Sequence, residues 1–322
     1  MAEAVPAEKV IRTIAAFDMD ETITCLVPLS PILGIREAQN VSMMRDQFKK
    51  MLPNSYTDAE LEEIGTFLWE NYREIFNEGA LRVMKLIKEN RDKFDHVCIF
   101  SNNTSNTMVN LIRVIINKFI GEGAQIIDAS YHINSKYHSY RGMTKVRTSQ
   151  TKTKEDLFNL IKKVYLGLED DDLPRMSDSD DDAHKGSVDL NAKILFYDDD
   201  SSHFIMRQKN VTSHHVNPKY NFYKDTRPFV EFFLRYEGLP ENLADWLMSA
   251  MNSINRTNIA ESAHGYAAIT SEAYYERMVK TTQDFIDSLG GSSGGGKRKS
   301  RRMRRKFTRK GSKKSRRHIK RH

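Results

Sequence analysis

Short blocks of apolar residues alternate along the chain with stretches in which apolar residues recur every three or four positions. The blocks lie at residues 14–17, 97–100, 126–127 with their neighbours, and 194–197, and we expect each to form a buried strand. Two helix faces lie between them, one formed by Val83, Met84 and Ile87 and the other by Met108, Ile112, Ile115, Ile116 and Phe119. This alternation predicts an α/β fold, an open parallel sheet joined by crossover helices.

Residues 36–77 form a different, purely helical stretch. One apolar stripe consists of Val41, Met44, Phe48 and Leu52, and a second of Leu61, Ile64, Leu68, Tyr72 and Ile75. A capping box at residues 57–60 marks the start of the second helix. Because this stretch directly follows the first strand, we expect a small helical cap over the carboxyl end of that strand.

A second helical block closes the folded part of the chain. Its apolar positions are Leu243, Trp246, Leu247, Ala250 and Ile254, followed by Tyr274, Met278, Phe285 and Leu289. We expect these stripes to pack in the core and assign residues 1–289 to a single domain.

Three segments of biased composition flank or interrupt this domain. Residues 290–296 read as a flexible Gly/Ser linker, and residues 297–322 as a disordered basic tail with 16 Lys and Arg and no acid. Residues 1–296 consequently hold 34 basic against 43 acidic side chains. Residues 167–188 form an acidic stretch that like-charge repulsion should keep a disordered surface loop. An acidic body therefore carries a basic tail that suits a polyanionic partner, either nucleic acid or an acidic protein.

Composition limits the environment of the chain. Cys25 and Cys98 are its only cysteines, which excludes a disulfide framework and fits a reducing compartment. No apolar run approaches the length of a membrane span, and the first ten residues lack the basic and apolar blocks of a secretory signal. We therefore expect an intracellular protein of the nucleus or cytoplasm with no membrane partner. The sequence leaves the oligomeric state open.

The first expected strand ends in a run of acidic residues. Asp18 and Asp20 follow Phe17 with one residue between them, and Thr22 comes soon after. In open α/β sheets ligands bind outside the carboxyl ends of strands, so both carboxylates lie where a reaction would take place. They could flank one reacting centre, where one attacks while the other transfers a proton. The alternative is an ordinary acidic turn at the end of a strand.

The last expected strand also ends in carboxylates, at Asp198, Asp199 and Asp200. Three adjacent carboxylates repel one another unless a cation neutralises them, and Mg²⁺ prefers oxygen ligands. The alternative is a solvated acidic turn, but the apolar residues of 192–197 place the triplet at the end of a buried strand.

Two further segments carry groups that could hold a phosphate. Ser101 and Asn102 follow the second strand, and a helix begins after them, so that hydroxyl, amide and backbone N–H donors gather there. The alternative is simple N-capping of that helix. Lys152 and Lys154 flank the predicted helix cap Thr153. Lys152 lies on the loop side of the cap and is the better candidate to face the site, whereas a surface lysine beside a cap is the alternative.

In this order the four clusters resemble the motifs of the haloacid dehalogenase-like (HAD) phosphatase superfamily. Asp18, Asp20 and Thr22 match its D-x-D-x-T motif, Ser101 the second motif, Lys152 or Lys154 the third, and Asp198 with Asp199 the fourth. The resemblance covers about residues 14–236. The D-x-D-E-T start and the Asp-Asp-x-Ser stretch are most similar to the RNA polymerase C-terminal-domain and Nuclear-LIM-interactor-type phosphatases. Ile23-Thr24 stands where that branch usually has Leu-Val, and the branch largely lacks a cap like 36–77.

The resemblance implies a Rossmannoid sheet and a Mg²⁺-dependent phosphatase. Asp18 would form an aspartyl-phosphate, and Asp20 would act as general acid and then as general base. Asp18, the Asp20 carbonyl, Asp198 and Asp199 would hold the Mg²⁺. Ser101 and Lys152 would complete the catalytic set, and Thr22, Asn102 and Lys154 would line the substrate-binding part, where Thr22 orients the loop.

The substrate implied by this branch is a phosphorylated protein, and another phosphomonoester remains open. One alternative is a nucleic-acid end phosphatase of the same fold, and another is a non-catalytic protein that tethers through its basic tail. The presence of both Asp18 and Asp20 favours an enzyme. The linker and tail resemble the endings of giant DNA virus proteins, which adds association with a virion as an expectation.

Overall fold

The computed structural model describes ten segments of the chain. They are residues 10–26, 29–34, 36, 55–103, 105–132, 152–167, 187–199, 209–216, 225–249 and 272–290. The first expected cap helix (41–52), most of the acidic loop (168–186), Asp200 and the tail (297–322) lie outside these segments.

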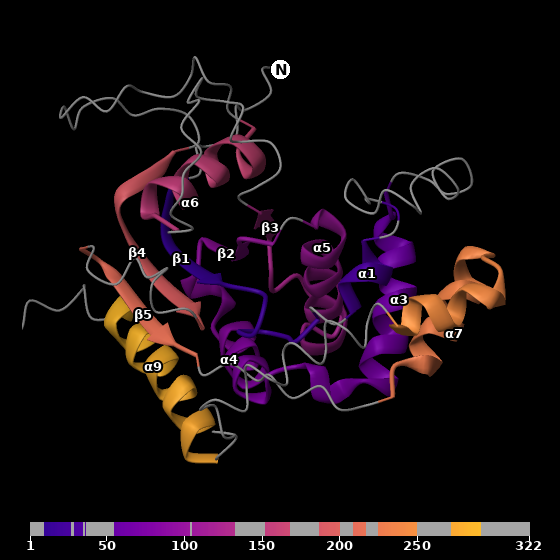
Figure 1. Cartoon of the computed structure of the whole chain (residues 1–322). Helices are drawn as coiled ribbons and strands as arrows, with labels where there is room; N and C mark the ends of the chain where they lie inside the picture. Colours follow the sequence, from indigo (N-terminus) through magenta and orange to yellow (C-terminus); the bar gives the residue numbers. More distant parts are fainter. Residues whose placement is uncertain are drawn as a thin grey trace, which may run out of the picture.

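Five parallel strands form one sheet in the centre of the molecule (Figure 1). The strands are β1 (Ile11–Phe17), β2 (His96–Ser101), β3 (Ala129–His132), β4 (Val188–Asp198) and β5 (Val211–His215). They pair in the order β3-β2-β1-β4-β5, so β1 lies in the middle, between β2 and β4. The predicted α/β fold with an open parallel sheet is therefore confirmed.

Side chains alternate between the two faces of the sheet, and each face is covered by its own helices. Helix α6 (Lys154–Leu160), which continues as the π-helical turn η5 (Ile161–Tyr165), covers one face, where Ile14 and Ala16 of β1 are buried. Helices α4 (Glu78–Glu89), α5 (Asn106–Ile115, continued by η4, Ile116–Ile120) and α9 (Glu272–Gly290) cover the other, with Ala15 and Phe17 (Figure 1). This is the two-faced burial typical of a parallel sheet.

A second group of helices lies beside α5. Helix α3 (Asp58–Asn71) begins at the predicted capping box of Thr57 and Glu60 and packs against α5 so closely that a Cβ on Gly65 would lie 2.6 Å from Ile115. The short elements α1 (Ser30–Leu33), η2 (Arg73–Ile75), η3 (Arg91–Lys93) and η8 (Glu241–Leu243) connect the larger ones. Helix α7 (Arg227–Glu237) is joined to the end of α3, since the Phe229 N–H donates to the Tyr72 hydroxyl at 3.1 Å.

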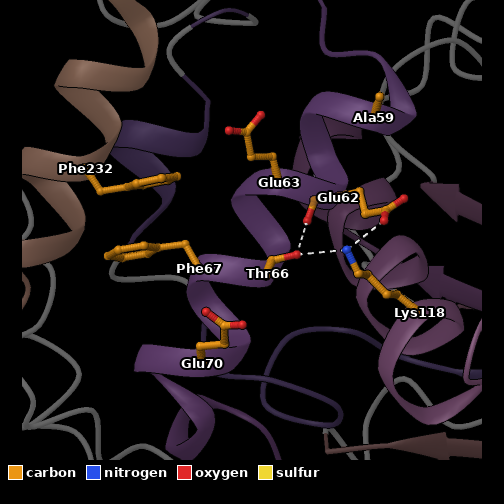
Figure 2. A pocket seen from close by; sticks show the side chains of 8 residues that line it. All are labelled: Ala59, Glu62, Glu63, Thr66, Phe67, Glu70, Lys118 and Phe232. Atoms are coloured by element: carbon orange, nitrogen blue, oxygen red, sulfur yellow. Dashed lines mark hydrogen bonds and ion pairs between the residues drawn. The ribbon is translucent and has the colours of Figure 1, made fainter.

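Helix α3 thus belongs to the main core, because its buried residues share one apolar cluster with β1 and α5. Its outer face forms an open groove of about 500 Å³ with η4 and α7. Figure 2 shows the stacked rings of Phe67 and Phe232 on one side of this groove and Lys118 beside Glu62 on the other. None of the predicted site residues lines it.

The structure differs from the sequence-based expectations at five points. Ile126 and Ile127 are buried but precede the strand, which begins at Ala129. Strand β5 was not expected, because its sequence VTSHH is polar and half-exposed, as suits the edge of a sheet. Trp246 is 44% exposed although its stripe predicted burial. At the segment boundaries, Val188 already belongs to β4 and Gly290 still belongs to α9.

No described helix is both long and apolar enough to cross a membrane.

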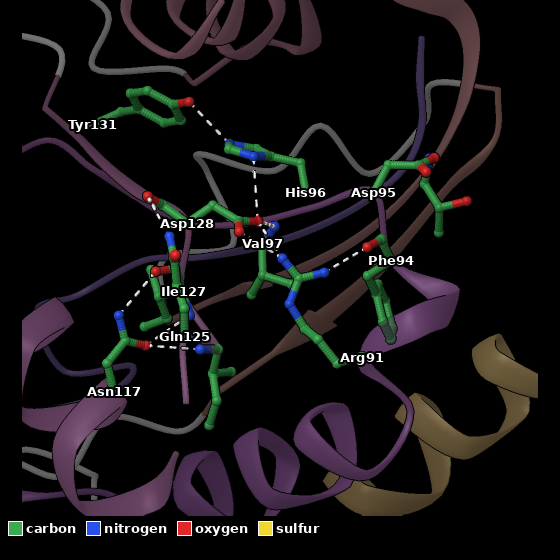
Figure 3. Close-up of polar contacts among 12 residues, drawn as sticks. Arg91, Phe94, Asp95, His96, Val97, Asn117, Gln125, Ile127, Asp128 and Tyr131 are labelled. Carbon is green, nitrogen blue, oxygen red and sulfur yellow. Dashed lines mark hydrogen bonds and ion pairs between the residues drawn. The ribbon is translucent and has the colours of Figure 1, made fainter. Parts of the chain in front are cut away.

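A buried carboxylate joins the amino ends of β2 and β3 (Figure 3). Asp128 accepts a hydrogen bond from the Val97 N–H at 2.7 Å and forms an ion pair with Arg91 at 2.5 Å. The His96 ring lies 3.4 Å away through Nδ1 and contacts the Tyr131 hydroxyl through Nε2 at 2.9 Å. Asp128 therefore holds three elements together: η3, β2 and the segment leading into β3.

We predict that Asp128→Ala lowers the free energy of unfolding by about 3 kcal/mol, because it leaves a guanidinium and a backbone N–H without their carboxylate. Urea unfolding at neutral pH measures this change. The control is Asp92→Ala, which removes an exposed carboxylate one residue after Arg91 and should change the free energy of unfolding by less than about 0.5 kcal/mol. Equal effects of the two variants would contradict the prediction.

The difference in the free energy of unfolding between the wild type and Asp128→Ala should depend on pH. Burial by itself raises the pKa of Asp128, but His96, Val97 and Arg91 together outweigh it, so that the pKa lies below its ordinary value of 3.8. A lowered pKa stabilises the fold above the ordinary value, and this stabilisation is lost as the pH falls through the folded value. The difference between wild type and Asp128→Ala should therefore shrink below pH 3.8.

Candidate active site

The central strand pair brings two of the predicted aspartates together. Strands β1 and β4 are paired in register up to Phe17 and Tyr197, and the Asp18 N–H donates to the Tyr197 carbonyl at 2.8 Å. Asp18 follows the end of β1, and Asp198 is the last residue of β4. Both carboxylates are buried at the carboxyl edge of the sheet, where ligands of open α/β sheets bind.

Lys152 lies between these two carboxylates. Its Nζ donates to Asp18 Oδ1 at 2.5 Å and to Asp198 Oδ2 at 2.8 Å, and its side chain is 1% exposed. Lys152 reaches this position because it directly precedes Thr153, the N-cap of α6. Burial by itself lowers the pKa of Lys152, but Asp18 and Asp198 outweigh that effect and raise it. The site therefore contains a fully buried ammonium that stays charged.

A third carboxylate completes an acidic cluster. Oxygens of Asp18, Asp198 and Asp199 lie within 4.8 Å of one another, and the Thr22 hydroxyl donates to Asp199 Oδ1 at 3.2 Å. Burial, followed by the charges of Asp18 and Glu21, raises the pKa of Asp199 to about 9. One ammonium does not balance this charge, and the donors are all oxygens, which fits a hard cation such as Mg²⁺. The structure thus supports a metal site formed by three of the predicted ligands.

Asp20 faces the same edge from the loop that follows β1. Its Oδ2 accepts a hydrogen bond from the Asn103 side-chain amide at 2.8 Å. Its Oδ1 is buried and has no hydrogen-bond partner within the described part of the chain. Burial and the charge of Asp18 raise the pKa of Asp20 to about 7. A carboxyl group with such a pKa can both donate and accept a proton near neutral pH.

The loop that carries Asp20 is held by backbone contacts. The Glu21 N–H donates to the Thr24 carbonyl at 2.7 Å, and Glu21 itself has a left-handed φ of 62°. Two further hydrogen bonds tie this loop to the segment after α3: Cys25 donates to Ile75 at 2.9 Å, and Asn77 donates to Ile23 at 2.8 Å. The tight turn is therefore fixed from outside, which keeps Asp20 close to Asp18.

Polar groups from β2 complete the edge. Ser101, the last residue of β2, is buried, and its Oγ accepts a hydrogen bond from the Asn103 N–H at 3.1 Å. Asn102 lies half-buried between these two residues. Asn103 was not among the predicted site residues, although it belongs to the donor-rich stretch that was noted after the second strand. Only the structure shows that its amide contacts Asp20.

One predicted site residue lies elsewhere. The Lys154 Nζ donates to the Leu190 carbonyl at 2.9 Å and lies over the Phe158 ring, on the side of α6 that faces the beginning of β4. Lys154 stands in the first turn of α6, so its side chain leaves the helix in a different direction from that of Lys152. The structure therefore does not bring Lys154 to the site, and its expected substrate-binding position is corrected.

We compared the chain with known proteins, and no family model, no curated protein and no solved structure matches it.

We predict that Mg²⁺ binds at the acidic cluster and stabilises the fold. At 100 times its dissociation constant, a ligand that binds only the folded state adds about 2.7 kcal/mol to the free energy of unfolding. The melting temperature of the wild type should therefore rise with the Mg²⁺ concentration, measured by differential scanning calorimetry at constant ionic strength.

Asp199→Asn should remove most of this rise, because it deletes one anionic ligand and relieves the repulsion that the cation would neutralise. Asp189→Asn is the matched control: Asp189 lies near the beginning of the same strand, β4, and the Mg²⁺ response of that variant should equal that of the wild type. A rise of the same size in Asp199→Asn would place the ion at another site.

Proposed function

We propose that this chain is a Mg²⁺-dependent phosphatase of the HAD type that hydrolyses a phosphomonoester through an aspartyl-phosphate on Asp18. The observation that carries the proposal is the buried Lys152 ammonium, which contacts Asp18 and Asp198 at once. It joins a nucleophile candidate to a cation site within one cluster. Asp20 lies on a loop beside that cluster, where Asn103 contacts its carboxyl group. This carboxyl group could transfer the proton that the leaving oxygen of a phosphomonoester needs.

In the first step an oxygen of Asp18 forms a bond to phosphorus, and the bond between phosphorus and the ester oxygen breaks. Asp20 gives its proton to that leaving oxygen, so that an alcohol departs. In the second step Asp20 takes a proton from a water molecule whose oxygen attacks phosphorus. The bond from phosphorus to Asp18 then breaks, which releases inorganic phosphate and restores the Asp18 carboxylate and the protonated Asp20.

The remaining residues fix charges and orientations for this sequence. Lys152 holds the Asp18 carboxylate in one orientation and brings a positive charge close to the phosphoryl oxygens. Ser101 and the N-terminus of α5 offer hydroxyl and backbone N–H donors to the same oxygens. Asp18, Asp198, Asp199 and the Asp20 carbonyl would hold Mg²⁺, which when bound neutralises negative charge on the transferring group. Thr22 orients Asp199 by its hydrogen bond.

The first test measures turnover of p-nitrophenyl phosphate, a phosphoserine peptide and a 3′-phosphorylated oligonucleotide in Mg²⁺. We predict that the full chain hydrolyses p-nitrophenyl phosphate and that Asp18→Asn reduces turnover by at least about 10³-fold, because an amide is a poor nucleophile. Asn has the shape of Asp, so circular dichroism should be unchanged. Preferred turnover of the peptide would assign a phosphoprotein substrate, and preferred turnover of the oligonucleotide a nucleic-acid end. An active Asp18→Asn variant would rule out the mechanism.

The second test compares the two lysines that flank Thr153. We predict that Lys152→Met lowers kcat by about 10²–10³-fold, because it removes the charged donor from the site. Lys154→Met should stay within about twofold of the wild type, since the contacts of Lys154 in the described part of the chain, with two β4 carbonyls and the Phe158 ring, lie away from the cluster. Thermal unfolding in Mg²⁺ verifies that both variants are folded. An inactive Lys154→Met beside an active Lys152→Met would reverse the assignment.

A further inference from the structure

We infer that Asn103 is a positioning residue that holds Asp20 so that its Oδ1 faces the leaving group. This inference rests on the proposed function and assigns a role to a residue that none of the four sequence motifs includes.

The orientation of the Asn103 amide is fixed by a backbone donor. Its Oδ1 accepts a hydrogen bond from the Ser105 N–H at 2.7 Å. An N–H group can only donate, so the oxygen of the amide must face Ser105 and the nitrogen must face Asp20. The Asn103 N–H in turn donates to Ser101 Oγ at 3.1 Å, which ties the residue to the end of β2. Asn103 is therefore held from two sides in one orientation.

This orientation makes the two oxygens of Asp20 different. Oδ2 accepts from the Asn103 Nδ2 at 2.8 Å, and an amide nitrogen has no lone pair that could accept a proton in return. A protonated Asp20 therefore carries its proton on Oδ1, the buried atom that has no partner in the described part of the chain. In the transfer the bond from Oδ1 to hydrogen breaks and a bond from hydrogen to the leaving oxygen forms. Asn103 thus decides which oxygen transfers the proton.

A purely structural role competes with this inference, because the contact between Asn103 and Ser105 also shapes the turn before α5. The two roles differ in the part of the amide they need. The turn needs only the acceptor oxygen, which an Asp at position 103 would keep. Positioning of Asp20 needs the donor nitrogen, which an Asp would replace with a second carboxylate facing Asp20.

The experiment measures kcat/KM in Mg²⁺ for two substrates that differ in their need for a proton. Phenyl phosphate has a basic leaving group that needs protonation, whereas 2,4-dinitrophenyl phosphate has an acidic one that departs without it. We expect Asn103→Ala to lose about 10²-fold on phenyl phosphate and less than about fivefold on 2,4-dinitrophenyl phosphate. Asn103→Asp should show the same selective loss. Asp20→Asn is the reference for full loss of the proton donor and should show the largest difference between the two substrates.

Ser105→Ala is the matched structural control. It removes the hydroxyl that accepts from the Met108 N–H at the start of α5 and leaves the contact with Asp20 in place, so any loss should be equal for both substrates. Equal losses in Asn103→Ala, or restored activity in Asn103→Asp, would overturn the role of Asn103 while the phosphatase activity stands. A wild-type chain that hydrolyses neither substrate would overturn the proposed function, and the inference with it.

Discussion

The parallel pairing of β1 with β4 is the constraint on which the site depends. The two strands are not adjacent in sequence, and they end together because Phe17 is paired with Tyr197. A slip by one residue would turn every side chain of β1 to the opposite face and separate Asp18 from Asp198. The register is held by burial on both faces and by the stacking of Phe17 on Tyr197, whose ring centres lie 5.1 Å apart. The hydroxyl of Tyr197 also contacts the Thr282 hydroxyl of α9 at 2.6 Å, so that the same residue anchors a helix.

The buried charges at this edge contact one another in the core, and the proposed chemistry uses the same residues. Burying one ammonium and several carboxylates is costly unless each has a partner of opposite sign. Lys152 serves two carboxylates, and its Nζ also lies 5.9 Å from the ring centres of Phe100 and Phe196, so it is enclosed by the core. The three carboxylates of the cluster outnumber this one ammonium, and burial together with the charges of Asp18 and Glu21 raises the pKa of Asp199. A divalent cation would supply the missing positive charge between these carboxylates.

The fold class and most of the clustered residues could be predicted because both depend on local pattern. A buried strand followed by carboxylates places those carboxylates at one edge of a parallel sheet, and a lysine just before a helix cap points away from the helix, as Lys152 does. Strand β5 escaped prediction because edge strands lack the apolar run of central ones. Asn103 escaped because its role depends on the distance to Asp20, 83 residues earlier, and a polar turn residue looks the same with or without that contact.

The loop between Asp18 and Thr24 shows how distant packing reaches the site. Glu21 has a left-handed backbone, which costs about 1 kcal/mol or more in a residue other than glycine and persists only when its surroundings enforce it. Two backbone hydrogen bonds hold the loop in place: the Ile75 carbonyl accepts from the Cys25 N–H, and the Asn77 N–H donates to the Ile23 carbonyl. These residues lie between α3 and α4, and the side chain of Asn77 also caps α4. The position of Asp20 therefore depends on the connection between α3 and α4, which lies outside the site and holds its loop through the backbone.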